Sequence, residues 1–351
     1  MQGVEFERHA LFALPDLLHS LLNLDADDAP IEIETCQGDE RFDASVRAKG
    51  HQWFFEVKAS SGPGTIDQVA DRFEKLLDEG DMAAAVLVVP YMSTAGGIAA
   101  SRRNINWIDL SGNARIFRDR VHILVEGRKN KFTQRGRPAS AFATKSSRIA
   151  RHMLSDPSRW WKQTELSRET GLDRGRVSRV VRRLEDDELL VRRGSTLRPK
   201  KPELLLDAWA EKYHLDRHDL VNGHLSGSGT DLAMSLADKL QSAGIRHGFT
   251  GLPAAWAYSK HARFRLCSVY VEMDPRTAAA EVGMRPTERG ANIQLIGPND
   301  LDVLHSSRLV AGYQCVSPVQ TYLDLRDLPE RAKEAADHLR TEGLLWSDHE
   351  Q

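Results

Sequence analysis

Apolar residues in the N-terminal third of the chain follow helical spacing first and extended patterns afterwards. Residues 6–22 carry apolar side chains at helical spacing and predict an amphipathic helix. An alternating pattern at residues 31–34 predicts a strand. Residues 84–89 are apolar throughout and stop at Pro90, which is typical of a central strand buried on both faces. The order of these elements predicts an α/β domain over residues 1–127.

The middle of the chain predicts three short helices followed by a hairpin. The helices are expected at residues 146–154, 165–170 and 174–187. Thr164 is the expected N-cap of the second helix, because its hydroxyl can accept a hydrogen bond from the first helical turn. The third helix is amphipathic, with one apolar side formed by Val177, Val180, Val181 and Leu184. Residues 189–198 indicate two short strands around a turn at Gly194, so the segment 144–201 has the organisation of a winged helix-turn-helix.

The remainder of the chain predicts an α+β domain over residues 222–351. Residues 202–220 indicate a helical connection, and the Gly/Ser-rich stretch 222–229 marks a boundary. The elements expected after it are a helix at 231–243, strands at 267–271 and 292–296, and an amphipathic helix at 329–345.

Composition bounds the class of protein. The 351 residues are 41% hydrophobic and 28% charged, which is ordinary for a globular chain and allows two or three domains. No apolar run is long enough to cross a bilayer, and the start lacks a basic region leading into an apolar stretch. We therefore expect a cytoplasmic protein with no membrane partner. Cys36, Cys267 and Cys315 are too few and too widely spaced to indicate a disulfide framework or a structural zinc site.

Charge is distributed unevenly along the chain. The whole chain has a net charge of -2, whereas residues 128–201 contain twenty-one basic and eight acidic residues, a net charge of +13. A basic block in an otherwise acidic chain indicates a polyanionic partner, because each phosphate that is neutralised releases condensed counterions.

The third helix of this block can present its basic side chains to double-stranded DNA. Arg176, Arg179 and Arg183 recur three and four residues apart, opposite the apolar side. The expected DNA-binding residues are Arg174, Arg176, Ser178, Arg179, Arg183, Arg192 and Arg193. Arg176, Ser178 and Arg179 are the candidates for base contacts, whereas the hairpin arginines suit backbone phosphates. The alternative is a protein-binding surface with a solvated charged face.

A second group of candidate functional residues lies near the N-terminus. Asp43 is followed thirteen residues later by Glu56-Val57-Lys58, at the end of the apolar run Trp53-Phe54-Phe55. Alternation in a strand places Glu56 and Lys58 on the same face. Two carboxylates can bind a hard divalent cation, and a lysine beside them can orient an attacking water.

This arrangement resembles the active-site core of the PD-(D/E)xK, or restriction-endonuclease-like, nucleases. The resemblance implies Asp43, Glu56 and Lys58 as catalytic residues, Gln68 as a supporting glutamine, and Mg²⁺ or Mn²⁺ bound by Asp43 and Glu56 if the site is active. A hairpin turn at Lys49-Gly50 would bring the two strands together. The alternative is a retained fold with an unused site.

Two further resemblances concern the rest of the chain. Residues 164–184 resemble the winged domains of many bacterial regulators. Residues 315–325, together with Thr250-Gly251-Leu252-Pro253-Ala254-Ala255, resemble the C-terminal part of AbiEi-type antitoxins of type IV toxin-antitoxin systems. That resemblance covers about residues 145–351 and implies repression of the protein's own promoter and a nucleotidyltransferase-type toxin as partner.

Two functions are therefore expected for a chain with an α/β nuclease-like domain, a winged helix-turn-helix and an α+β C-terminal domain. The first is a DNA-binding transcriptional regulator of the antitoxin type. The second is a metal-dependent DNA endonuclease targeted by its winged helix. A homodimer is compatible with the first, although no sequence feature identifies its interface.

Overall fold

The computed structural model shows a mixed α/β protein with several sheets. The residues it describes are 3–22, 33–35, 42–48, 51–76, 84–119, 121–132, 140–261, 263–287, 289–326, 328, 331–344 and 346. The chain divides into two compact units, residues 1–139 with 183–189 and residues 140–182 with 190–351. Each unit is described by itself.

The first unit is built on one sheet, in which the described strands follow the order of the chain from β1 to β7. The helices are α1 (Gly3–Leu22), α2 (Pro63–Leu76) and α3 (Thr94–Arg102). The strands are β1 (Ile33–Thr35), β2 (Ala44–Ala48), β3 (His51–Val57), β4 (Ala85–Val89), β5 (Asn106–Asp109), β6 (Ala114–Arg118) and β7 (Val121–Val125). Strands β3, β4 and β5 are parallel to one another, and the remaining pairs are antiparallel.

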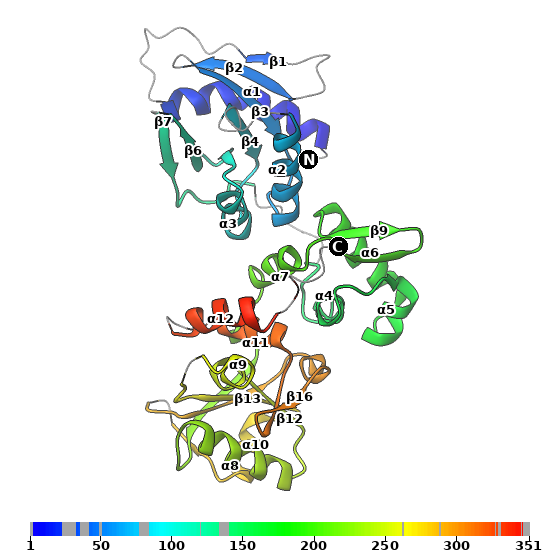
Figure 1. The fold of residues 1–351 in the computed structure, drawn as a ribbon, viewed down its shortest axis with the longest axis vertical. Coiled ribbons are helices and arrows are strands. Elements are labelled where there is room, and N and C mark those ends of the chain that lie inside the picture. Colours follow the sequence, from blue (N-terminus) through cyan, green and yellow to red (C-terminus); the bar gives the residue numbers. More distant parts are fainter. Residues whose placement is uncertain are drawn as a thin grey trace. The chain divides into compact units, whose positions relative to one another are not determined.

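Helices cover both faces of this sheet (Figure 1). Helix α1 packs its apolar side, with Phe6 and Leu14, onto the face that carries Phe55 and Val88. Helices α2 and α3 pack on the other face, where Leu87 belongs to a second buried cluster. Strand β4 is fully buried between the two layers. The prediction of a central strand ending before Pro90 is confirmed.

Two details of the first unit concern the expected strands. The strand expected at residues 31–34 is described only from Ile33, because residues 31 and 32 lie outside the described residues. The expected turn at Lys49-Gly50 also lies outside them, but β2 and β3 pair from Ala44 with Phe55 to Ala48 with His51. The two strands that hold the candidate carboxylates are therefore antiparallel neighbours.

The second unit starts with a helix, a short strand, two helices and a hairpin, although the end of the third helix, from residue 183, is counted with the first unit. These are α4 (Ser147–Ser155), β8 (Trp161–Lys162), α5 (Gln163–Thr170), α6 (Arg174–Asp186), β9 (Leu190–Arg193) and β10 (Thr196–Pro199). The short strands form a sheet in the order β8, β10, β9. All the helices and strands expected in this segment are present, within one or two residues of the expected bounds. Helix α7 (Pro202–Ala210) follows and packs against α4.

The expected N-cap of α5 is wrong. The helix begins at Gln163, one residue before Thr164, and Lys162 occupies the N-cap position. The backbone N–H of Lys162 donates to the Glu165 carboxylate at 3.0 Å, which satisfies one donor at the start of the helix. The start of α5 is therefore capped by a carboxylate three residues into the helix and not by the expected threonine hydroxyl.

The last part of the second unit is a mixed seven-stranded sheet of the described strands, in the order β14, β11, β15, β13, β12, β17, β16. The strands are β11 (Asp219–His224), β12 (His247–Thr250), β13 (Cys267–Val271), β14 (Arg285–Pro286), β15 (Ile293–Gly297), β16 (Arg308–Val310) and β17 (Tyr313–Cys315). The helical elements are η2 (Leu215–Arg217), α8 (Gly229–Ser242), α9 (Gly251–Ser259), α10 (Pro275–Glu281), η3 (Leu301–Leu304), α11 (Pro318–Arg326) and α12 (Arg331–Glu342). Helices α9, α11 and α12 pack against one another and lie above the strands in Figure 1, with α8 and α10 below.

The C-terminal domain was expected to begin at residue 222. Its sheet begins earlier, at Asp219, where β11 starts to pair with β15. Cys267 and Cys315 are buried free thiols, and burial raises the pKa of each to about 12. Cys36 lies outside the described residues. No helix in the described ranges is both long and apolar enough to cross a membrane.

Candidate nucleic-acid interface and carboxylate site

Helix α6 has the two-sided character that its spacing predicts. Val177, Val181 and Leu184 are fully buried, and Val180 is nearly so. The turn before the helix is tight, because Gly171 adopts a left-handed conformation with φ of 66°. Burial of the apolar side therefore determines which side chains of α6 face solvent.

Basic and polar side chains occupy the opposite side of α6. Arg174 and Arg179 are exposed, and Arg176 and Ser178 are half-buried. Arg182, which the spacing argument did not include, is also exposed. These residues fall within about two and a half turns of the helix, so they can meet one ligand surface together.

The start of α6 is capped by an acidic residue. The Asp173 carboxylate accepts a hydrogen bond from the backbone N–H of Arg176 at 2.8 Å, and this bond lowers the pKa of Asp173. In the preceding turn, the Ser167 hydroxyl donates to the carbonyl of Leu172 at 2.6 Å. The angle between α5 and α6 is thus held by local hydrogen bonds as well as by the apolar side.

The remaining expected DNA-binding residues lie at the end of α6 and on the hairpin. Arg183 is exposed and forms an ion pair with Asp187 at 3.1 Å, so it is partly neutralised. Arg192 and Arg193 are exposed on β9, next to a two-residue loop in which Gly194 has φ of 58°. The hairpin thus presents two arginines beside its tip.

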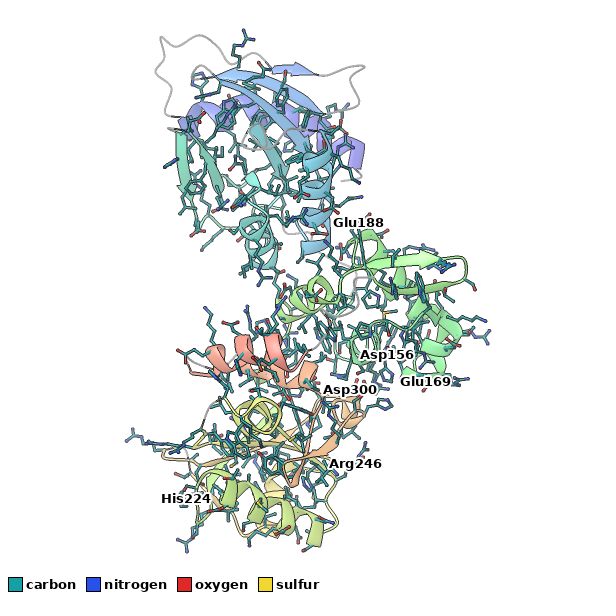
Figure 2. All side chains as sticks on the ribbon, viewed as in Figure 1. Asp156, Glu169, Glu188, His224, Arg246 and Asp300 are labelled. Atoms are coloured by element: carbon teal, nitrogen blue, oxygen red, sulfur yellow. The ribbon has the colours of Figure 1, made fainter. Side chains whose placement is uncertain are left out.

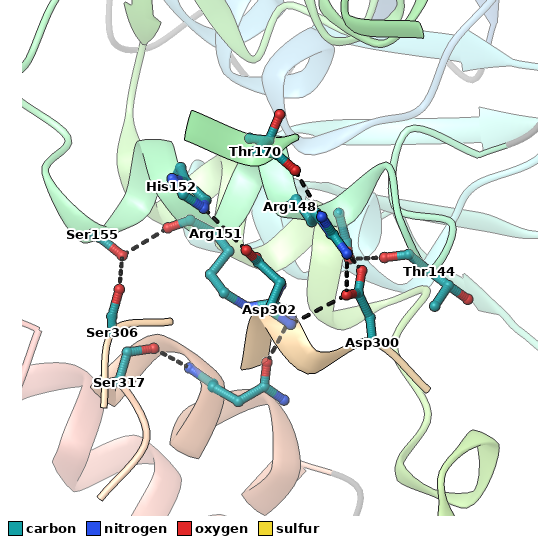
Figure 3. Close-up of polar contacts among 12 residues, drawn as sticks. Thr144, Arg148, Arg151, His152, Ser155, Thr170, Asp300, Asp302, Ser306 and Ser317 are labelled. Atoms are coloured by element: carbon teal, nitrogen blue, oxygen red, sulfur yellow. Dashed lines mark hydrogen bonds and ion pairs between the residues drawn. The ribbon is translucent and has the colours of Figure 1, made fainter. Parts of the chain in front are cut away.

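Two arginines of the basic block serve another purpose. Arg148 donates to both oxygens of Asp300, at 2.8 and 2.6 Å, and also to the carbonyl of Thr170 at 2.7 Å (Figure 3; Asp300 is also labelled in Figure 2). Arg151 is buried and donates to Asp302 at 2.8 Å. The charge count of the sequence therefore overstates what residues 128–201 offer to a polyanion, because these two cations are used inside the unit.

The candidate carboxylates lie at the end of the β2–β3 pair. The backbone N–H of Asp43 donates to the carbonyl of Phe55 at 3.0 Å, immediately before the first paired residue of β2. The Asp43 carboxylate accepts a hydrogen bond from the backbone N–H of Val57 at 2.7 Å. Asp43 therefore sits opposite Glu56 across the ladder, and one of its oxygens is held by the backbone.

Glu56 is buried beside two cations. Only 2% of its surface is exposed, and its Oε1 lies 2.7 Å from the Lys58 ammonium and 3.6 Å from Nε of Arg72. The expectation that Glu56 and Lys58 project together is met. Gln68 is exposed on α2, whereas Arg72, one turn later, reaches Glu56. Arg72 is therefore the residue of α2 that forms an ion pair with Glu56, and sequence reasoning did not identify it.

The second oxygen of Glu56 bears on metal binding. Oε2 is buried and has no hydrogen-bond partner among the described residues. A buried carboxylate oxygen without a partner is costly unless a cation or water meets it. The donor set of Asp43 and Glu56 is all oxygen, which suits Mg²⁺ or Mn²⁺. These residues fit a hard cation, while Lys58 and Arg72 already offset the charge of Oε1.

The C-terminal part holds a buried polar network centred on Asp324. Its carboxylate is fully buried and accepts hydrogen bonds from Tyr213, Tyr270 (3.0 Å), Thr250 and Gln320 (2.9 Å). Burial raises the pKa of Asp324 to about 6, although the four donors act in the opposite direction. The network joins Thr250, from the motif that carries the antitoxin resemblance, to the closing helix α11.

No match was found when the chain was compared with models of protein families, with curated proteins and with solved structures.

Proposed function

We propose that this protein is a DNA-binding transcriptional regulator that contacts double-stranded DNA through α6 and the β9–β10 hairpin. The observation that carries the proposal is the exposed side of α6, where Arg174, Arg179 and Arg182 project opposite a fully apolar side. A helix of this kind fits the major groove, and hairpin arginines can reach the adjacent phosphates.

The alternative of a protein-binding surface is less well supported by the composition of this face. Protein interfaces are centred on apolar and aromatic anchors. The exposed side of α6 offers arginines and Ser178 instead, and the hairpin adds Arg192 and Arg193. Planar guanidinium groups suit bidentate contacts with phosphates and with the O6 and N7 atoms of guanine.

The proposal is tested by selecting duplexes that bind the full-length chain from a random library and then titrating the variants. Arg176→Ala with Arg179→Ala is expected to weaken binding and relax the sequence preference, since a bidentate base contact is worth about 1 to 3 kcal/mol. Arg168→Ala is the matched control, because Arg168 is exposed on α5 and paired with Glu169 at 2.9 Å. Equal affinity and equal preference in all three proteins would refute the assignment.

The biological role we propose is that of an AbiEi-like antitoxin that represses its own promoter, with a nucleotidyltransferase-type toxin as partner. This part of the proposal rests on the resemblance of residues 145–351. Co-expression with the products of neighbouring genes tests it. Rescue of growth from a toxic neighbour is expected, and a neighbourhood without any toxic gene would contradict it.

A metal-dependent DNA endonuclease is the second candidate function. The observation that favours it is the buried, unpartnered Oε2 of Glu56 beside Asp43 and Lys58. Mg²⁺ or Mn²⁺ held by Asp43 and Glu56 would polarise a phosphate and activate water, with Lys58 placed to orient that water. Cleavage of plasmid or branched DNA that is lost in Asp43→Ala would place this function first, and absence of cleavage would leave the domain as a scaffold.

A further inference from the structure

Three potential metal ligands meet where α4 packs against η3, within the second unit. His152 lies on α4, Asp302 lies in η3, and His305 follows η3 directly. One ligand atom from each lies within 4.8 Å of the others. Among the described residues, this is the group of three or more histidine, cysteine or acidic side chains that meets this spacing.

The backbone explains why these side chains converge. Side chains three residues apart in a 3₁₀ turn lie on the same side, which brings Asp302 and His305 together. The ring of His305 stacks on the ring of His152 with centroids 4.4 Å apart. Nε2 of His152 lies 3.2 Å from Oδ1 of Asp302, as Figure 3 shows. Residues about 150 positions apart in the chain therefore present two imidazoles and one carboxylate oxygen to a shared point.

The carboxylate is held from behind by other residues. Arg151 donates to Oδ2 of Asp302 at 2.8 Å and to Oε1 of Gln320 at 3.0 Å. The other carboxylate oxygen of Asp302, Oδ1, faces the imidazole of His152. Outer contacts of this kind orient metal-binding carboxylates in proteins. The positive charge of Arg151 weakens cation binding, so a site of moderate affinity is expected.

We propose that His152, Asp302 and His305 bind a divalent transition-metal ion of the Zn²⁺ class. Two neutral imidazoles and one carboxylate are a donor set that suits Zn²⁺ or Co²⁺ and disfavours Mg²⁺ and Ca²⁺, which prefer oxygen. His305 is exposed, so the ion can enter from solvent and keep a water as a further ligand. His152 is buried, so this ligand lies on the inner side of the site, away from solvent.

Such an ion would hold α4 against η3 with a defined coordination geometry, which ion pairs alone do not impose. The Arg148–Asp300 and Arg151–Asp302 pairs already join the same two segments. The metal would replace the hydrogen bond between His152 and Asp302 with coordination by both. Binding of the ion is therefore expected to stabilise the second unit against unfolding.

The test uses the full-length protein after removal of bound ions with a chelator. Calorimetric titration with Zn²⁺ is expected to show one site in the wild type, with affinity at least about tenfold weaker in His305→Gln, because loss of even an outer contact costs 10–100-fold. His305 is exposed, so this substitution leaves the fold intact, which circular dichroism checks. Asp302→Asn is the second variant and is expected to weaken binding as well.

His338→Gln is the matched control, since His338 stacks on His261 with centroids 4.1 Å apart and forms a second imidazole pair. Its Zn²⁺ affinity is expected to equal that of the wild type. Visible absorption of bound Co²⁺ reports the ligands directly and should change in shape, and saturate at higher Co²⁺ concentration, in His305→Gln. Absence of Zn²⁺ binding, unchanged affinity in His305→Gln, or loss of binding in His338→Gln alone would overturn the proposal.

Discussion

The hairpin arginines give the sharpest quantitative prediction for DNA binding. Arg192 and Arg193 are exposed on β9, beside the two-residue loop at Gly194. Replacing both with alanine removes two positive charges from the hairpin. We expect the double variant to bind all duplexes more weakly, by a factor that depends on salt and not on sequence.

The magnitude follows from the exposed arginines of the two elements, leaving out Arg179, which is assigned to a base contact, and Arg183, which is paired with Asp187. The remaining ones are Arg174, Arg182, Arg192 and Arg193. If each neutralises one phosphate, the slope of log K against log salt is about -3.6, since each contact contributes about -0.9. Raising the salt from about 50 to about 200 mM then weakens the wild type about 150-fold. With two contacts removed, the slope is about -1.8 and the loss about 12-fold.

The assay is fluorescence anisotropy with a labelled duplex across this salt range. Arg168→Ala, on α5, serves as the control and should keep the wild-type slope. An unchanged slope in the hairpin variant would refute the placement of these arginines at phosphates. A change of sequence preference without a change of slope would instead place them at base edges.

Three further outcomes are expected from other parts of the structure. Mn²⁺ should raise the melting temperature of the wild type but not of Asp43→Ala or Glu56→Ala, because a cation relieves repulsion between the two carboxylates; an equal rise in all three proteins would place the ion elsewhere. Asp324→Asn should alter the dependence of stability on pH. Since burial raises the pKa of Asp324 from 3.8 to about 6, the stability linked to its protonation is present below the unfolded pKa and is lost as pH rises through the folded pKa. Denaturant titrations should therefore show the wild type gaining about 3 kcal/mol over Asp324→Asn as pH falls from about 6 to below about 4, whereas a constant difference would contradict the assignment. Arg148→Ala should lower the free energy of unfolding by about 3 kcal/mol, because Asp300 would stay buried without its guanidinium partner, and the double variant with Asp300→Ala should recover part of the loss; equal losses in both would show that the pair is not coupled.

Local patterns predicted the elements well because their physical cause is local. The apolar run of β4 can only be buried on both faces, and the spacing of Val177, Val181 and Leu184 determines one buried side of α6. The bounds of β13, Cys267–Val271, agree with the prediction, and all five residues of the strand are buried. The same reasoning orients the exposed arginines of α6.

Contacts between distant segments could not be predicted in this way. Arg148 and Asp300 are 152 residues apart, and no periodicity in the sequence relates them. The convergence of His152, Asp302 and His305 depends on how α4 docks against η3, which composition does not encode. Arg72 was hidden for a similar reason, because its approach to Glu56 depends on the rotation of α2 over β3.

The central claim is that α6 and the β9–β10 hairpin contact DNA, and hydrogen–deuterium exchange tests it most directly. Full-length protein would be measured with and without a duplex selected from the random library, at low salt. We expect slower exchange in residues 174–182 and 190–199 when DNA is present, with little change in β13 and β15. Slower exchange confined to other segments, or no change with saturating DNA, would contradict the account.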